Sequence, residues 1–332
     1  MATRLAILLP LGLLLDQNCS EAQTLPYHWE QITLNAPFAA SDGAGALTFY
    51  GRMWLLGGWN PGDKVDFPKI CNSEVWASRD GLNWSEVNPE APWEGRHTAG
   101  WVVHHGRMWV VGGDCNQKHY QNDVWSSLDG VNWTLVLDAV PWAPRVLHLT
   151  YSFRGKLWVM GGQTMPAFAG GEEIFYNDVW SSGDGKKWER VLEHAPWAPR
   201  GMSSGQVIFK KRLWILGGGT YDTPTTPERK FYNDVWSTDD GVKWTCHTEH
   251  AVWEPRQYHE VAVWDDKMWV MEGWNQGNRN DVWYSSDGVT WVELPGTPWA
   301  PRHAASLFVH NDALWMVAGN NMQPDVWKLV RN

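Results

Sequence analysis

The sequence predicts an all-β protein, a six-bladed β-propeller, and the prediction depends on repetition. A Val-Trp dipeptide recurs six times, with its Trp at positions 76, 125, 180, 236, 283 and 327. The intervals of 49, 55, 56, 47 and 44 residues each match the length of a blade of four short strands. The chain also holds 27 Trp among its 332 residues, and a repeated unit with several Trp per copy explains this excess.

The third unit shows the order that the complete units follow. Arg145 opens an inner strand, and a second strand ends at the glycine pair Gly161-Gly162. A variable loop then leads to a third strand that contains Val179-Trp180. A turn at Asp184-Gly185 starts the fourth strand, since Asp-Gly between two strands is a strong hairpin signal. The glycine pair allows backbones to approach closely near the centre of the ring.

The last unit lacks its fourth strand. It ends at Asn332 soon after Trp327, without an Asp-Gly turn. Near the N-terminus, Trp29 precedes Phe38 by nine residues, and the same interval separates the fourth-strand Trp from the next Trp in complete units. We therefore expect the segment from His28 to Leu34 to be the outer strand of the last blade. This strand would close the ring and cover an edge that is otherwise exposed.

The N-terminus predicts export. Arg4 precedes the apolar run from Leu5 to Leu15, and small residues suited to cleavage follow within Ser20–Ala22. The run is too short for a comfortable transmembrane helix, and no later segment is apolar enough to span a bilayer. We expect a signal peptide over residues 1–22 and a single propeller domain over residues 23–332, in a secreted or periplasmic protein.

The cysteines leave two interpretations open. Cys19 leaves with the signal peptide, and a lipid anchor on it is a less favoured alternative. Cys71 and Cys115 lie in equivalent loops of neighbouring units, so an exported protein can pair them. Three free, partly buried thiols at Cys71, Cys115 and Cys246 explain the sequence equally well.

The charge excludes one broad function class. The formal net charge is -10 and the sequence pI is about 5.6. General nucleic-acid binding requires a basic face that releases counterions, so we do not expect a nucleic-acid partner.

The glycine pair, the aromatic strand after it and a Pro-Arg-x-x-His opening, as in Pro144–His148, resemble Kelch repeats. The resemblance covers residue 27 to the C-terminus and implies that the loops entering the inner strands and those following the glycine pairs share a ligand face. The family includes adaptors that hold acidic peptides with Arg at the entry position, and a bacterial exported sialic acid mutarotase. Galactose oxidase has a similar central domain, but the residues of its copper site have no counterpart here. We expect no metal and no other cofactor.

Arg occupies the entry position of five units, namely Arg96, Arg145, Arg200, Arg256 and Arg302. Five guanidinium groups on one rim would create a positive funnel suited to carboxylates and sulfates. The alternative is structural, because a residue that recurs in five blades is more often part of the scaffold. Each Arg would then bind a neighbouring loop or stack on a Trp.

Departures from the repeat identify further candidates in the fifth unit. Glu272 replaces the first glycine of the pair, and His259 and Glu260 follow the entry Arg closely. These three residues are the candidate general acids and bases. His148 and Tyr258 are candidate ligand-binding residues, although a buried structural role is the leading alternative for both histidines.

Two function classes remain open. We favour a binding module for an acidic peptide or an anionic glycan at an Arg-lined face, and we expect a monomer. The alternative is a carbohydrate-active enzyme, such as a sialic acid mutarotase, an epimerase or a polysaccharide lyase.

Overall fold

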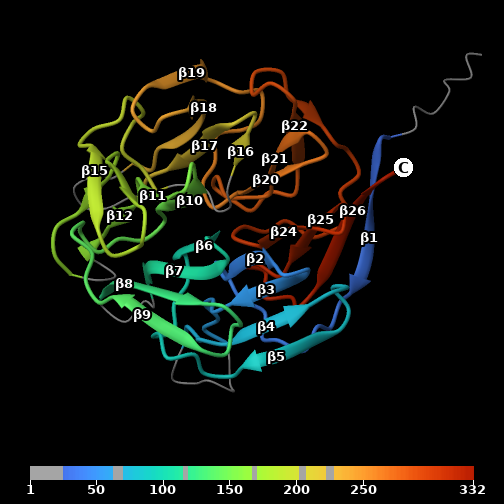
Figure 1. Cartoon of the computed structure of the whole chain (residues 1–332). Coiled ribbons are helices and arrows are strands. Elements are labelled where there is room, and N and C mark those ends of the chain that lie inside the picture. Colours follow the sequence, from blue (N-terminus) through green and yellow to red (C-terminus); the bar gives the residue numbers. More distant parts are fainter. Residues whose placement is uncertain (1–24, 63–69, 115–118, 167–169, 202–206, 222–227) are drawn as a thin grey trace, which may run out of the picture.

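The computed structural model describes residues 25–62, 70–114, 119–166, 170–201, 207–221 and 228–332. Within these residues, six four-stranded antiparallel sheets stand around a central axis (Figure 1), and the predicted six-bladed propeller is confirmed. The predicted signal peptide and Cys115 lie outside the described residues, and so does the proposed pairing of Cys115 with Cys71. No helix in the described part of the chain is long and apolar enough to cross a membrane.

Each blade is a meander whose first strand lies nearest the axis. From the inside outward, the strands of the first three blades are β2 (Gly45–Phe49), β3 (Arg52–Leu56), β4 (Val75–Ser78) and β5 (Trp84–Asn88); β6 (Gly100–His104), β7 (Arg107–Asp114), β8 (Tyr120–Ser127) and β9 (Trp133–Leu137); β10 (Leu149–Phe153), β11 (Lys156–Met160), β14 (Val179–Ser182) and β15 (Trp188–Leu192).

The last three blades follow the same order. Their strands are β16 (Ile208–Phe209), β17 (Arg212–Gly219), β18 (Phe231–Thr238) and β19 (Trp244–Thr248); β20 (Glu260–Trp264), β21 (Lys267–Met271), β22 (Val282–Ser285) and β23 (Val292–Glu293); β24 (Ser306–His310), β25 (Ala313–Val317), β26 (Val326–Arg331) and β1 (Tyr27–Thr33). A short ribbon of β12 (Gln163–Thr164) and β13 (Ile174–Phe175) lies in the loop of the third blade.

The N-terminal strand closes the ring, as the sequence predicts, with bounds one residue earlier than expected. β1 lies beside β26 in the ring (Figure 1) and pairs with it in antiparallel fashion, with Trp29 opposite Leu329. Tyr27 packs its ring against Trp264 and Trp269 of the fifth blade, with ring centroids 5.3 and 5.0 Å apart. The first and last segments of the chain therefore share one sheet, and its outer edge is supplied by β1.

Hydrophobic layers fill the spaces between neighbouring blades, and the many Trp residues build them. In five blades the Trp of the second strand packs against the Asp-Gly turn of the next blade. A Cβ on Gly241, for example, would lie 2.2 Å from the Trp158 ring. Gly241 also has a φ of +76°, so both the backbone and the neighbouring ring require glycine there. The turn glycine therefore serves packing between blades as well as the turn itself.

Candidate functional site

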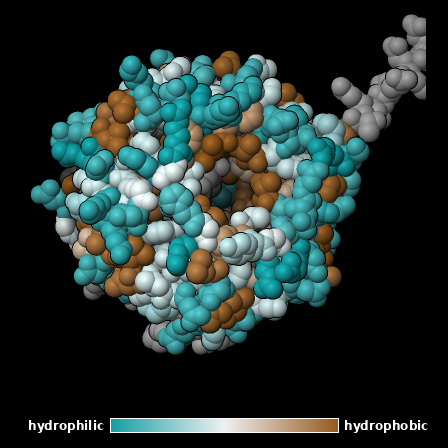
Figure 2. Space-filling model, in the orientation of Figure 1, coloured by the Kyte–Doolittle hydropathy of each residue, from teal (hydrophilic) through white to brown (hydrophobic). Residues whose placement is uncertain are grey.

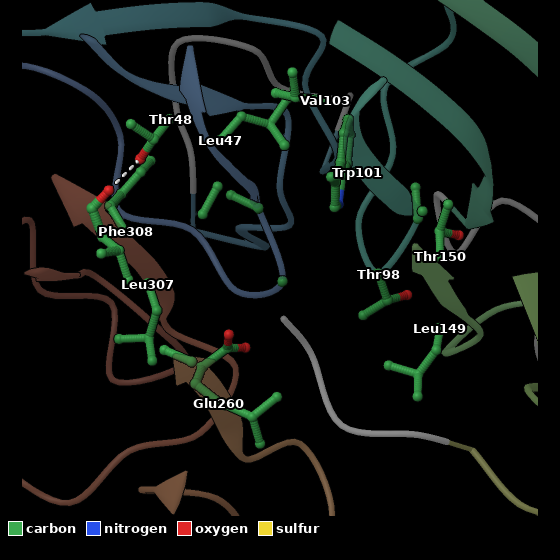
Figure 3. A pocket seen from close by; sticks show the side chains of 18 of the residues that line it. Leu47, Thr48, Thr98, Trp101, Val103, Leu149, Thr150, Glu260, Leu307 and Phe308 are labelled. Atoms are coloured by element: carbon green, nitrogen blue, oxygen red, sulfur yellow. Dashed lines mark hydrogen bonds between the residues drawn. The ribbon is translucent and has the colours of Figure 1, made fainter. Parts of the chain in front are cut away.

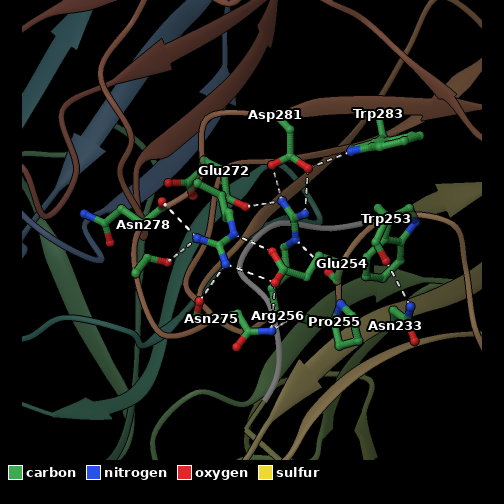
Figure 4. A network of polar contacts seen from close by, with 12 residues as sticks. Asn233, Trp253, Glu254, Pro255, Arg256, Glu272, Asn275, Asn278, Asp281 and Trp283 are labelled. Carbon is green, nitrogen blue, oxygen red and sulfur yellow. Dashed lines mark hydrogen bonds and ion pairs between the residues drawn. The ribbon is translucent and has the colours of Figure 1, made fainter.

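The entry arginines bind within their own blades. Arg256 donates from Nη1 and Nη2 to the two carboxylate oxygens of Asp281, both at 2.6 Å (Figure 4). Its Nη1 also donates to the Glu272 carbonyl at 2.8 Å, and its Nε donates to the Glu254 carbonyl at 2.9 Å. This bidentate, charge-assisted geometry satisfies the guanidinium group within the protein.

The same arrangement recurs in the other four blades that carry an entry Arg. The pairs are Arg96–Asp123, Arg145–Asp178, Arg200–Asp234 and Arg302–Asp325, with N–O distances of 2.5 to 2.7 Å. All five Arg residues are at most 1% exposed. The predicted Arg-lined face is therefore wrong: these side chains form ion pairs within five of the six blades and do not reach a ligand surface.

His148 and His259 also have structural positions. The Nε2 atom of His148 lies 3.2 Å from the Val111 carbonyl, and that of His259 lies 2.8 Å from the Leu216 carbonyl. Each imidazole therefore links its blade to the preceding one and donates from Nε2, since a carbonyl only accepts. Burial, reinforced by the nearby entry Arg, lowers the pKa of each to about 3, so both stay neutral. A general acid or base role for His259 is not supported.

Glu272 fills the space that a histidine occupies elsewhere. A Cβ on Gly112 would lie 3.3 Å from Cε1 of His148, so a glycine in one blade makes room for the histidine of the next. At the junction of the fifth and sixth blades, Glu272 replaces that glycine and Ala305 stands where the histidine would be. Glu272 is fully buried at a φ of +52°, and burial raises the pKa of its carboxyl group well above the usual range. We interpret Glu272 as a neutral wedge between blades, without access to solvent.

Glu260 lies on the wall of the central channel. Its carboxylate points into this cavity among the inner strands (Figure 3), which has a volume of about 380 Å³. The neighbouring wall is mostly apolar, with Leu47, Leu149 and Leu307 among the lining residues. Hydrophobic residues also ring the central opening in Figure 2. The structure thus separates Glu260 from the buried His259 and Glu272, and the three do not form one open site.

A backbone collar lies at one end of the channel. Its described members all have left-handed backbone conformations: Gly43, Thr98, Leu147, Tyr258 and Ala304, with φ between 47° and 59°. The backbone amides of four members each donate to the carbonyl of a neighbouring member at 2.8 to 3.3 Å; the donors are Gly43, Thr98, Leu147 and Ala304. Because these bonds run from blade to blade, the collar holds the loop ends of the inner strands at fixed positions.

Above the collar lies a second cavity of about 390 Å³, which we call the mouth cavity. It is lined by aromatic rings, carboxylates, imidazoles and amides, namely Trp59, Tyr120, Tyr221, Tyr258, Asp42, Asp114, His97, His303, Gln163 and Asn320, with Thr98, Val146 and Leu147 at its base. Tyr258 is therefore the one predicted site residue that the structure places here. Its ring stacks on His303 with centroids 5.2 Å apart, and burial raises the pKa of its hydroxyl.

Two polar groups of the mouth cavity are buried without a protein partner in the described structure. They are Oε1 of Gln163 and Oγ1 of Thr98. Gln163 is only 1% exposed, so its unmatched carbonyl oxygen costs free energy unless water or a ligand supplies a donor. The cavity thus offers hydrogen-bonding groups that the described part of the chain leaves unmatched.

An acid–base pair spans the mouth cavity. Oδ2 of Asp42 lies 3.6 Å from Nε2 of His303, and Nδ1 of His303 lies 2.8 Å from Oδ1 of Asn278. Asn278 in turn donates to the side chain of Asn320 at 3.0 Å. The imidazole is therefore held in one orientation between a carboxylate and an amide. Among the described residues, no group of three or more His, Cys, Asp or Glu side chains is arranged to hold a metal ion.

The mouth residues occupy the positions directly after those that recur. Asp42, His97 and His303 each follow the entry position of a blade, and Trp59 and Asp114 each follow a glycine pair. Isolated β-bridges pair these two sets, as between Asp42 and Trp59 or between His97 and Asp114. The variation at these positions, next to scaffold positions that recur in most blades, is the signal in the sequence that could have identified the site.

Comparison with known proteins supports the fold. No protein-family model matches the sequence, and no match with a curated protein was found. Among solved structures 471 chains match, including one described as the structure of YjhT. YjhT has 14% sequence identity and a TM-score of 0.69 over 90% of this chain and 96% of its own. At this identity the likeness shows the fold alone, and so many matches show how widely the fold is used.

Proposed function

We propose that this protein is an exported binding module whose mouth cavity holds an uncharged, hydroxyl-rich ligand of the sugar class. The observation that carries the proposal is the combination, in one cavity, of aromatic rings with buried polar groups that have no partner among the described residues. Sugar rings offer an apolar face for stacking and many hydroxyl groups for hydrogen bonds. A volume of about 390 Å³ lies within the usual range of small-ligand sites.

The charges of the cavity favour a neutral ligand over an anionic one. Asp42 and Asp114 are both among the lining residues, whereas none of the described lining residues is Lys or Arg. The arginines expected to bind an acidic peptide or an anionic glycan are buried in ion pairs. An anion would therefore meet like charges among the lining residues and no lining guanidinium group; the guanidinium group of Arg229 lies outside the lining, 4.5 Å from the Tyr221 ring.

A glycan array tests this proposal. The mature protein should bind neutral saccharides and should not prefer sialylated or sulfated ones. Replacement of Asp42 by Asn should weaken this binding, whereas Asp312→Asn, at an exposed hairpin turn of the last blade, should leave it unchanged. Preferential binding of anionic glycans would overturn the proposal, as would the absence of any glycan binding. Sequencing of the N-terminus of exported protein tests the expected start near Gln23.

Carbohydrate-active catalysis in the same cavity is the second candidate, favoured by the oriented Asp42–His303–Asn278 chain. An imidazole fixed between a carboxylate and an amide is a suitable proton carrier. If this function holds, His303→Gln should abolish turnover of a bound sugar, followed by NMR, while binding persists. If the wild-type protein binds the sugar but does not turn it over, catalysis is excluded and the binding function remains.

A further inference from the structure

The tight turns of the blades, two in each of the first five and one in the sixth, emerge on one face of the ring, opposite the mouth cavity. In an antiparallel meander, the turn between the first and second strands and the turn between the third and fourth strands must lie at the same end. Two contacts between blades confirm this, because Lys210 donates to the Ser286 carbonyl at 2.8 Å and His310 Nε2 lies 2.8 Å from the Arg79 carbonyl. We call this surface the turn face.

The turn face is basic over the third and fourth blades, although the whole chain is acidic. Turns 153–156, 182–188, 209–212 and 238–244 contain eight basic residues and three acidic ones. The basic residues are Arg154, Lys156, Lys186, Lys187, Lys210, Lys211, Arg212 and Lys243. The corresponding turns of the fifth blade, 264–267 and 285–291, contain one basic residue and three acidic ones. The positive charge is therefore local to one side of the face.

These cations are available to a partner. All except the half-buried Arg212 are exposed. In the described structure the one ion pair of this group is Lys156–Glu189, at 4.0 Å. Lys210 and Lys211 also hold left-handed conformations, with φ of 49° and 60°, at a hairpin tip where Gly51 takes that role in the first blade. Lysine is unfavourable in this conformation, so turn geometry alone does not explain its presence.

Exposed aliphatic side chains project from the same face. The residue after the Asp-Gly dipeptide is Leu82, Val131, Val242 and Val289 in four blades, with exposed fractions of 54%, 49%, 46% and 53%. Val242 lies directly beside Lys243 in the basic region. Exposed aliphatic side chains beside flexible Lys and Arg side chains are complementary to a surface whose anionic groups cover an apolar layer.

We propose that the basic part of the turn face docks the protein on an anionic lipid surface. Lys and Arg near such a surface are attracted to its headgroups within about a Debye length, so salt should weaken the contact. The adjacent Val tips would enter the boundary between headgroups and acyl chains. The mouth cavity would then face away from the membrane, open to a soluble ligand.

Vesicle co-sedimentation tests the proposal. The mature protein should bind vesicles that contain phosphatidylglycerol, less so at high salt, and should ignore vesicles of phosphatidylcholine alone. The double variant Lys186→Glu/Lys187→Glu should reduce binding by about tenfold or more. The matched control Arg190→Glu/Lys230→Glu makes the same change in charge away from the turn face and should bind like the wild type.

A second variant separates a lipid surface from a soluble polyanion. Val242→Ser/Val289→Ser should weaken vesicle binding severalfold while keeping the thermal unfolding midpoint, since both side chains are exposed. Equal vesicle binding by the lysine variant and its control would overturn the proposal. Capture on immobilised dextran sulfate without binding to anionic vesicles would also overturn it and would identify a polyanionic chain as the partner.

Discussion

Asp42 and His303 lie 3.6 Å apart across the seam where the first and last blades meet. Asp42 comes from the loop that enters β2, and His303 comes from the loop that enters β24. The seam exists because β1 completes the last blade, so closure of the ring and assembly of the mouth cavity depend on one another. A variant that loosens the seam should therefore weaken both the fold and the site.

Tyr27→Ala tests the closing strand. Loss of its buried ring, which packs on Trp264 and Trp269, should lower the free energy of unfolding by roughly 3–5 kcal/mol. Tyr50→Ala is the matched control, because that ring is 71% exposed and its loss should change stability by about 0.5 kcal/mol or less. Urea unfolding followed by Trp fluorescence measures both. Equal stability of the two variants would show that β1 contributes little to closure.

The sequence was sufficient for the fold because the repeat encodes each blade separately. The Val-Trp interval, the Asp-Gly turn and the Trp29–Phe38 interval specify strand order and closure without knowledge of distant contacts. The site was different. Recurrence of Arg in five blades indicated a shared role but could not show where the guanidinium group points.

One clue to the arginines was present in the sequence. An Asp precedes the Val-Trp dipeptide in the five blades that begin with Arg, whereas the first blade has Ser41 at the entry and Glu74 before Val-Trp. The entry residue and the acidic residue therefore change together, as partners of an ion pair do. The mouth cavity required the structure itself, since its residues come from loops of different blades that the collar brings together.

Arg256→Ala should destabilise the protein by roughly 3–5 kcal/mol, because it leaves Asp281 without its partner in a buried setting. Arg190→Ala removes an arginine from an exposed pair with Glu193 and should cost about 0–1 kcal/mol. Denaturant unfolding of both variants provides the comparison. A stable Arg256→Ala protein that has lost ligand binding would favour a ligand role for the entry arginines.

Glu272 and Ala305 should behave as an exchangeable pair. Glu272→Gly should leave a void and Ala305→His should crowd the junction, each destabilising by roughly 1–3 kcal/mol. The double variant recreates the glycine–histidine junction seen between the second and third blades, so it should recover most of the loss. A double-mutant cycle by thermal unfolding measures this coupling. Purely additive losses would contradict the wedge interpretation.

The pH dependence of stability should carry the signature of Glu272. Its pKa is raised in the folded protein, so its contribution to stability is complete below the ordinary pKa of a Glu and declines as the pH rises toward the folded value. Glu272→Gln should therefore gain stability relative to the wild type as the pH rises from about 4 to 8. Parallel stability curves for the two proteins would show that Glu272 is not held neutral.

The buried histidines should contribute to the loss of folding stability at acidic pH. The pKa of His148 and of His259 is about 3 in the folded protein, against an ordinary value of 6.5. Their contribution to stability is full above 6.5 and is lost as the pH falls toward 3, because protonation favours the unfolded chain. His148→Gln should flatten the decline between these values in equilibrium unfolding. An unchanged slope would contradict the assignment of a neutral buried imidazole.

The most direct test of the mouth cavity is titration calorimetry of the chain from residue 23 onward with a neutral saccharide that it binds on the array. Asp42→Asn should raise the Kd by about tenfold or more, since it removes a charged acceptor from the cavity and the partner of His303. Asp312→Asn, at a hairpin turn on the turn face, should leave the Kd unchanged. Wild-type affinity in Asp42→Asn, or an equal loss in both variants, would contradict a ligand site at the mouth of the ring.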